Sequence, residues 1–206
     1  MPTPDALTRA ASAVVDLYRD GAADYVARRT TTLFERPWLD RFLALAPDGP
    51  VLDLGCGFGE PVARYLIARG RRVIGVDASA ALLDHARAAW PNQTWVEADM
   101  RAFTPGAPVA AVIAWHSLFH LRPAQQAELI ARIGGWLVEG GVAMFTSGDR
   151  ADERLGDWNG VPLYHASLDP GAYAAALARG RLRVVEQVTD DASAGNATIW
   201  LARKGG

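Results

Sequence analysis

The chain has 206 residues, of which 50% are hydrophobic, enough to bury the core of one compact domain. Its 21 basic and 23 acidic residues nearly balance at a net charge of −2 and are scattered, so no basic track predicts binding to nucleic acid. No apolar run reaches the roughly 18 residues of a membrane span, and the N-terminus lacks a signal-peptide pattern. The lone cysteine, Cys56, offers neither an intrachain disulfide nor a cysteine zinc site. We therefore expect a cytoplasmic protein without a membrane partner.

Four segments follow one another within this single domain. Residues 1–47 form a leader in which apolar side chains recur at helical spacing. Strand and helix patterns then alternate over residues 48–146. Residues 147–169 show no clean period and are too long for a simple connection, which predicts a substrate cap. Residues 170–206 contain a helix and two closing strands.

The alternation predicts the fold class. The expected strands are 51–54, 72–76, 94–98, 109–115, 142–146, 181–188 and 198–202, and the expected core helices are 61–69, 80–90, 123–138 and 169–179. Alternating strands and helices produce a parallel sheet with helices on both faces. The last two strands have no helix between them, so they form a hairpin and one of them runs antiparallel. The sequence thus predicts an α/β fold with a seven-stranded, mostly parallel sheet and a helical leader.

A glycine-rich loop, residues 55–59, lies between the first expected strand and a helix. Glycine lets the backbone adopt positive φ and approach a ligand closely, and the first amides of the helix point into the same crevice. A dinucleotide fingerprint needs G-x-G-x-x-G, but the spacing here is G-x-G-x-G, and Glu60 beside it would repel a pyrophosphate. Asp53 is instead well placed for a cationic group. A loop with a structural role alone is the alternative.

Polar residues stand at or just past four expected strand ends. They are Asp53, Asp77, Asp99 and His116. Ligands of open α/β sheets bind outside the carboxyl ends of the strands. Helix capping by Asp77 and a turn at Asp99 are alternative explanations for each residue alone. Taken together, the four positions predict one binding crevice along this edge.

These motifs resemble those of class I S-adenosylmethionine (SAM)-dependent methyltransferases, and more narrowly the small bacterial methyltransferases of the ubiquinone/menaquinone-methyltransferase type. The resemblance covers nearly the whole chain and is carried by residues 35–39, 51–59, 98–101, 114–121 and 164–168. It implies a Rossmann-like sheet, SAM as cofactor and a small-molecule methyl acceptor. The chain departs from the expected pattern where His116 replaces an acidic residue.

The resemblance implies a role for each residue of the crevice. Asp77 would accept the ribose hydroxyls, Asp99 would accept the adenine amino group, and the Met100 backbone would contact the ring. Asp53 and the backbone of Gly55 would hold the methionine ammonium. Further cofactor contacts are expected from the loop, the adenosine pocket and the leader, namely Cys56, Gly57, Gly59, Ala78, Trp115, Tyr25 and Arg28. Core packing is the alternative for Trp115, and helix packing or exposure for Tyr25 and Arg28.

Histidines supply the candidates for acid–base chemistry. His116 and His120 are four residues apart, so they share one face if this segment is helical. Imidazole titrates near neutrality, so either histidine is a candidate general base, with a structural role as the alternative. Two histidines without a third ligand do not predict a metal site. Tyr164 and His165 lie in the expected cap and would contact the acceptor, unless they belong to a surface loop.

The predicted activity is methyl transfer from SAM to a small molecule, which leaves S-adenosylhomocysteine (SAH). An NAD(P)-dependent oxidoreductase on a related sheet and a non-catalytic SAM-binding module are the alternatives. No Asn-Pro-Pro-Tyr-like tetrapeptide follows the fourth strand and no Pro-Cys nucleophile is present, so methylation of nucleic acid is not predicted. The sequence specifies neither the acceptor, nor its reacting atom, nor the oligomeric state.

Overall fold

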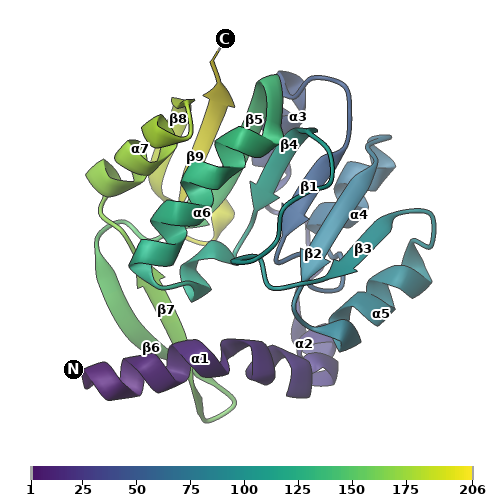
Figure 1. Ribbon diagram of the computed structural model, residues 1–206. Coiled ribbons are helices and arrows are strands. Elements are labelled where there is room, and N and C mark those ends of the chain that lie inside the picture. The colour runs from purple at the N-terminus through teal and green to yellow at the C-terminus, as the bar shows by residue number, and fades with distance from the viewer. Residues whose placement is uncertain (1, 206) are drawn as a thin grey trace.

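The computed structural model describes residues 2–205, arranged around one central sheet (Figure 1). The strands of that sheet are β1 (Val51–Leu54), β2 (Val73–Asp77), β3 (Thr94–Glu97), β4 (Val109–Ala114), β5 (Leu137–Ser147), β8 (Leu182–Asp191) and β9 (Ala197–Lys204). The helices are α1 (Pro4–Asp20), α2 (Ala22–Arg28), α3 (Arg36–Leu45), α4 (Val62–Ala68), α5 (Ala80–Ala89), α6 (Pro123–Trp136) and α7 (Pro170–Arg179). A second sheet pairs β6 (Asp152–Trp158) with β7 (Val161–Ser167), and single 3₁₀ turns cover Leu118–His120 and Ala192–Ala194.

The central sheet has seven strands in the order β3-β2-β1-β4-β5-β9-β8. The pairs among β1 to β5 are parallel, whereas β9 runs antiparallel to both β5 and β8. The predicted mostly parallel sheet with a closing hairpin is therefore confirmed. The chain moves outward from β1 to β3 and then returns to β4, so the order reverses between β1 and β4. Ligands of open α/β sheets bind at such a reversal.

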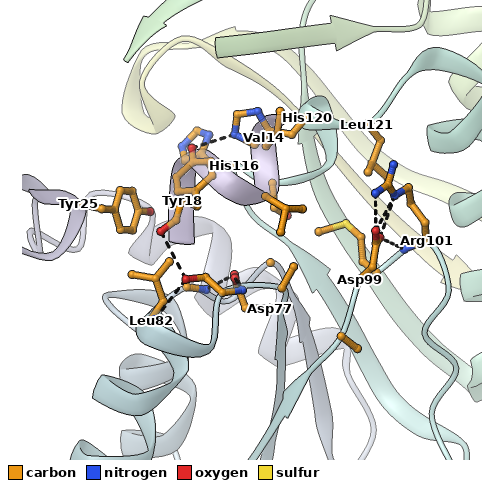
Figure 2. Close-up of a pocket in the computed structure, with 18 of the residues that line it drawn as sticks. Val14, Tyr18, Tyr25, Asp77, Leu82, Asp99, Arg101, His116, His120 and Leu121 are labelled. Carbon is orange, nitrogen blue, oxygen red and sulfur yellow. Dashed lines mark hydrogen bonds and ion pairs between the residues drawn. The ribbon is translucent and has the colours of Figure 1, made fainter. Parts of the chain in front are cut away.

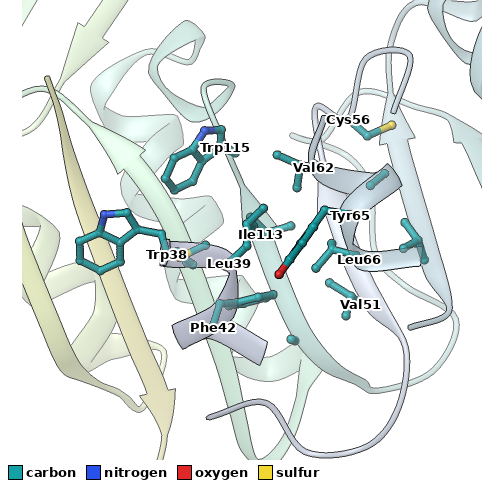
Figure 3. Close-up of a cluster of buried hydrophobic side chains, with 14 of the residues drawn as sticks. Trp38, Leu39, Phe42, Val51, Cys56, Val62, Tyr65, Leu66, Ile113 and Trp115 are labelled. Atoms are coloured by element: carbon teal, nitrogen blue, oxygen red, sulfur yellow. The ribbon is translucent and has the colours of Figure 1, made fainter. Parts of the chain in front are cut away.

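Helices cover both faces of the sheet because alternate strand residues point to opposite sides. On one face Val51 of β1 packs in a cluster with Phe42 of α3 and Leu66 of α4 (Figure 3). On the other face Leu52 packs with Ile130 of α6 and Leu177 of α7. Each fully buried side chain of this size stabilises the fold by roughly 1.5–3 kcal/mol. The two clusters hold the strand ends at fixed positions.

A cap of α1, α2, β6 and β7 lies across the carboxyl ends of the strands (Figure 1). Thr3 starts α1 by accepting a hydrogen bond from the N–H of Ala6 at 3.3 Å. Ala10 and Val14 of α1 then pack against Leu163 and Tyr164 of β7. The cap thus joins segments from distant parts of the chain. Between residues 2 and 205, no helix has the length and apolar character of a membrane span.

The segment 147–169 is more regular than its sequence suggested. It contains the β6–β7 hairpin, in which Asp152 pairs with Ser167 and Trp158 pairs with Val161. The connecting residues Asn159 and Gly160 have φ values of 52° and 82°. An Asn-Gly pair in this conformation is typical of a two-residue hairpin turn. That pair was the local signal for the hairpin, and the expectation of an irregular loop was wrong.

The helix predicted over 123–138 ends earlier than expected. β5 begins at Leu137 and continues through Gly140 and Gly141, which lie between the helix expected over 123–138 and the strand expected over 142–146. The pairing with β4 is irregular there, because Val109 pairs with Leu137 whereas Ala111 pairs with Val142. Glycine suits the resulting bulge, and Gly140 has a φ of 72°. The two glycines therefore bend a strand instead of stopping a helix.

Candidate functional site

The loop after β1 follows a path that glycine makes possible. Gly55, Gly57 and Gly59 have φ values of 71°, 55° and 87°. A Cβ on Gly55 would lie 2.4 Å from the Cβ of Ser117. Two N–H groups of the loop donate to the carbonyl oxygen of Val76 at 2.7 and 3.1 Å, which fixes the loop to β2. The glycines therefore bring the backbone to the edge of the sheet.

Asp77, the last residue of β2, connects the glycine loop to α5. Its Oδ2 accepts from the N–H of Gly57 at 2.8 Å and its Oδ1 accepts from the N–H of Ser79 at 2.9 Å. Burial raises the pKa of this carboxyl, and the backbone hydrogen bonds offset part of that effect. A carboxylate retains lone pairs beyond these two bonds. Asp77 can thus order the start of α5 and still accept hydrogen bonds from a ligand.

A first cavity lies between the strand ends and α1 and contains about 800 Å³ of empty space, part of it open to solvent (Figure 2). Its walls come from α1, α2, α5 and the loops after β1 to β4. The predicted site residues in these walls are Tyr25, Gly55, Gly57, Asp77, Ala78, Asp99, Met100, His116 and His120. The fold therefore brings most of the predicted site together.

Asp99 lies on the cavity wall beside Arg101, with which it forms a bidentate ion pair (Figure 2). Burial alone would raise the pKa of Asp99, but hydrogen bonds from the side chain and backbone of Arg101 lower it overall. The carboxylate is ionised at neutral pH as a result. Arg101 also fixes its orientation, so a donor group in the cavity would meet a prearranged acceptor.

Asp53 does not share this wall, although the sequence predicted one crevice for Asp53, Asp77 and Asp99. Its side chain is 3% exposed and lies in β1 behind the glycine loop. Burial, and secondarily the charge of Asp77, raise the pKa of Asp53 to about 7. Two carboxylates thus face the cavity, and the third lies beneath it.

Four further predicted cofactor residues lie outside the wall of the first cavity in the described chain. Cys56 and Trp115 are 8% and 5% exposed and belong to the apolar cluster on the α3 face of the sheet. Gly59 faces Trp90, whose ring a Cβ would approach to 2.6 Å. The Arg28 side chain is 68% exposed and binds Asp24 and Asn159 at the turn of the hairpin. Packing, the alternative interpretation of Trp115, is the one that the structure favours.

Arg29 was missed by the sequence analysis. With Arg28 it lines a separate pocket that shares Tyr25 with the first cavity, but its charge acts on residues of the first cavity. Its guanidinium contributes, after burial, to the pKa values of Tyr25 and His116, which both line the cavity. Its Nε is buried and has no hydrogen-bond partner among residues 2–205. Arg28 and Arg29 lie three and four residues after Tyr25, and both intervals place a side chain on the helical face of Tyr25. The spacing in the sequence therefore did not distinguish Arg29 from its neighbour.

Glu35 is a second residue that the sequence analysis did not assign. It is 0% exposed, and neither carboxylate oxygen has a hydrogen-bond partner within the described chain. Burial raises the pKa of Glu35, while the charge of Arg29 and the nearby indole N–H of Trp115 act in the opposite direction. The indole approaches without a well-aligned hydrogen bond, since its Nε1 is also unpartnered. A buried polar cluster thus lies behind His116.

His116 lines both the first cavity and a second one. It has a φ of 52°, and its N–H donates to Oγ1 of Thr146 at 2.9 Å. It precedes the 3₁₀ turn and lies in no helix, so the helical face predicted for His116 and His120 does not exist. Burial, and then the charge of Arg29, lower the pKa of His116 to about 4. The imidazole is therefore neutral at physiological pH.

His120 has both ring nitrogens engaged. Its Nε2 lies 3.0 Å from the hydroxyl of Tyr18, and its Nδ1 lies 3.0 Å from the carbonyl oxygen of Tyr164. A carbonyl only accepts, so Nδ1 carries the proton and Nε2 accepts from Tyr18. Burial lowers the pKa of His120 to about 4. No ring nitrogen is left for a substrate, so His116 is the better candidate for acid–base work.

The second cavity lies between β5, the hairpin and the β8–β9 connection. His165 lines it, as expected of an acceptor contact. Tyr164 does not line either cavity. Its hydroxyl donates to Glu153, and its side chain packs against α1. The charged residues of the lining are Asp149, Arg150, Asp152, Arg154 and Asp190. Within residues 2–205, no group of three or more His, Cys, Asp or Glu side chains is arranged to hold a metal ion.

Known proteins share this architecture. Residues 51–141 match the family described as methyltransferase domain. The trans-aconitate 2-methyltransferase of Azoarcus sp. strain BH72 is 37% identical over 134 residues, which are 64% of this chain and 49% of that protein. A SAM-dependent methyltransferase from Clostridium acetobutylicum has a TM-score of 0.72 at 13% identity, over 92% of this chain and 99% of that one. The CcbJ methyltransferase from Streptomyces caelestis has a TM-score of 0.73 at 20% identity, over 92% and 98%.

The strand order and the cavity at the strand ends define the class first: the molecule has the fold of the class I SAM-dependent methyltransferases. Within the chain, the matched segment 51–141 is similar to the family described as methyltransferase domain, and the trans-aconitate 2-methyltransferases resemble it in sequence. The chain spans about half the length of the curated relatives that it matches. The resemblance to class I SAM-dependent methyltransferases that was inferred from the sequence is confirmed for the fold and for the matched segment.

Proposed function

We propose that this protein transfers a methyl group from SAM to a small-molecule acceptor. The observation that carries the proposal is the first cavity, whose wall offers a separate group to each part of SAM. We assign Asp77 to the ribose hydroxyls, and Asp99 with the Met100 backbone to the adenine, because all three residues line this cavity. A Cβ on Gly57 would meet only Tyr25, at 3.6 Å, so the loop backbone beside them faces open space.

The methionine end of SAM requires partners for a carboxylate and an ammonium. Arg29 is our candidate for the carboxylate, because its buried Nε lacks a partner in the described chain and its charge acts on both Tyr25 and His116. The backbone of Gly55 and the field of the buried Asp53 favour an ammonium nearby. Arg29 therefore replaces Arg28 as our candidate cofactor contact from the leader, because the side chain of Arg28 is bound to the hairpin turn.

The second cavity is our candidate for the acceptor site, since it meets the first at His116. When bound, SAM supplies a methyl group that its sulfonium already activates. The protein then has to orient the acceptor, an effect that can contribute roughly 7–11 kcal/mol. Neutral His116 can accept a hydrogen bond from the acceptor, but an imidazole with a pKa of about 4 is a weak base. An acceptor that is already ionised suits this site.

A carboxylate is such an acceptor, and we propose a small organic acid. Several relatives are trans-aconitate 2-methyltransferases, although the second cavity carries charges of both signs. Arg150 pairs with Asp149 at 2.9 Å and Arg154 with Asp152 at 3.9 Å, while Asp190 adds a third carboxylate. A site with this balance favours acids of lower charge than a tricarboxylate. We propose a bacterial, cytoplasmic enzyme that acts on neither nucleic acid nor membrane.

Calorimetry with SAH tests the cofactor, and transfer of label from methyl-labelled SAM tests the activity. We expect saturable SAH binding, no competition by NADH, and label in a mono- or dicarboxylate in preference to trans-aconitate. Binding of NADH but not SAH would overturn the proposal in favour of an oxidoreductase. SAH binding without label in any acid of the panel or in a metabolite extract would favour a non-catalytic SAM-binding module.

A further inference from the structure

The cap contributes to both cavities at once. Val14 and Tyr18 of α1 form the roof of the first cavity, and His165 of β7 lines the second. Between residues 2 and 205, no residue of the β6–β7 hairpin lines the first cavity. The hairpin nevertheless packs against α1, through Leu163 and other apolar side chains. A movement of α1 that admits a ligand to the first cavity therefore also disturbs the contacts of the hairpin, which forms part of the wall of the second cavity.

His120 joins these two parts of the cap by hydrogen bonds. The hydroxyl of Tyr18 donates to its Nε2 at 3.0 Å, and its Nδ1–H donates to the backbone carbonyl of Tyr164 at 3.0 Å. Its ring centroid also lies 4.8 Å from that of Phe119 and 5.0 Å from that of His165. Phe119 and His165 both line the second cavity. His120 thus touches the roof of one cavity and the wall of the other.

We propose that His120 is a positioning residue that couples the two cavities. Closure of α1 over a bound cofactor places the Tyr18 hydroxyl against Nε2, which fixes the imidazole and, through Nδ1, the backbone of β7 at Tyr164. The wall of the acceptor cavity is then fully ordered only when the first cavity is occupied. Because coupling between binding sites is reciprocal, an acceptor in the second cavity also retains the cofactor. The inference rests on the proposed binding of SAM or SAH in the first cavity.

The hydrogen bond between Tyr18 and His120 contributes strongly to this coupling because it is partly buried. If α1 lifts, Nε2 loses its donor in a site surrounded by protein, and an unsatisfied buried acceptor is costly. The apolar contact between α1 and β7 is a competing route for the coupling. Tyr18→Phe separates the two routes, because it removes the hydroxyl and retains the ring that packs against Tyr25 and Trp158 with centroids 5.4 and 5.2 Å away.

Hydrogen–deuterium exchange of the full chain with and without SAH tests the proposal. In the wild type, SAH should slow exchange in peptides from α1 and also in peptides covering 152–167. In Tyr18→Phe and His120→Gln, SAH should still protect α1, while the SAH-dependent protection of 152–167 falls about fivefold, the factor expected for one typical hydrogen bond. Tyr65→Phe is the matched control, because it removes a hydroxyl bonded to Asp40, a residue of α3. That variant should behave as the wild type.

The outcomes separate the possibilities. A merely structural His120 would make the hairpin exchange faster in the free and the SAH-bound variants alike, with the SAH-dependent difference unchanged. That result overturns the coupling, as does an SAH-bound wild type whose hairpin exchange does not change. If the wild-type protein does not bind SAH, the result contradicts the proposed function itself and therefore also the coupling that rests on it. Loss of the SAH-dependent difference in both variants, with α1 still protected, supports the coupling.

Discussion

The carboxylate of Asp77 accepts a hydrogen bond from the backbone N–H of Gly57 across 2.8 Å, and this bond joins the end of β2 to the loop after β1. We expect Asp77→Ala to weaken SAH binding about 10- to 100-fold, because hydrogen bonds to a charged group contribute roughly 1.5–3 kcal/mol. Part of the loss would come from the ribose and part from the freed loop. Isothermal titration calorimetry measures it.

Asp84→Asn provides the control for this prediction. Asp84 lies in α5, the helix that follows Asp77, and forms an exposed ion pair with Arg87 at 2.8 Å. Exposed pairs of this kind contribute little, so this variant should bind SAH as the wild type does. Unchanged affinity in Asp77→Ala would show that the first cavity is not the cofactor site.

Arg29→Ala should weaken SAH binding, whereas Arg28→Ala should not. The two residues are adjacent, but Arg28 binds Asn159 at 2.7 Å in an exposed position and Arg29 has a buried Nε without a partner in the described chain. If Arg29 holds the methionine carboxylate, its loss should leave the affinity for 5′-methylthioadenosine unchanged, since that compound lacks the amino-acid end. Competition binding with both ligands measures the difference. Equal losses for both ligands would assign Arg29 to packing of the cap.

The contributions of His116 and His120 to stability should be lost as the pH is lowered from about 6.5 to about 4. Burial lowers the pKa of His116 and His120 to about 4, whereas the unfolded histidines titrate near 6.5. Between these values the unfolded chain binds more protons, so protonation favours unfolding. Each histidine contributes up to roughly 3 kcal/mol of stability above pH 6.5 that is lost by pH 4.

A comparison of variants separates this histidine effect from the buried carboxyls of Asp53, Asp77 and Glu35, whose raised pKa values act in the opposite direction on acidification. Urea unfolding of wild type and His120→Gln at pH 7.5 and 4.5 is the measurement. The wild type should lose more unfolding free energy than the variant on acidification, since these carboxyls are common to both. Parallel losses would mean that His120 is protonated in the folded protein.

Glu35→Gln should leave the protein as stable as the wild type at pH 8, or more stable. The carboxylate is 0% exposed and has no hydrogen-bond partner among residues 2–205, so its ionised form is held at a cost that a neutral amide avoids. Burial raises the pKa of Glu35, which means that its contribution to stability is lost as pH rises through that pKa. Thermal unfolding at pH 5 and pH 8 should therefore show a gain for the variant that grows with pH.

Glu186→Gln is the matched substitution on the surface, where Glu186 pairs with Arg41 at 2.9 Å and is 38% exposed. It should change the unfolding free energy by less than about 0.5 kcal/mol at either pH. A strong loss of stability in Glu35→Gln at pH 8 would show instead that Arg29 or Trp115 binds the charged carboxylate.

Local patterns determined the central sheet. The expected strand at 109–115 is a continuous apolar run, which is typical of a strand buried on both faces, and all six residues of β4, Val109–Ala114, are buried. Ser79 has a residue type that favours the start of a helix, and it caps α5 by accepting from the N–H of Leu82 at 3.4 Å. Because parallel strands end at one edge, the polar residues that follow them predicted the position of the site. The periodicities of strands and helices arise from residues that are close together in the chain, so they can be recognised from the sequence alone.

The tertiary structure decided which side chains reach the cavities. It buries the Nε of Arg29 while Arg28 binds the hairpin turn, buries Asp53 in β1, and pairs residues 152–167 as a hairpin that packs on α1. It also turns His120 from a candidate base into a link between Tyr18, 102 residues away in sequence, and Tyr164, 44 residues away. Such contacts depend on the angle and distance at which whole elements pack, and the local periods of the chain do not contain that information.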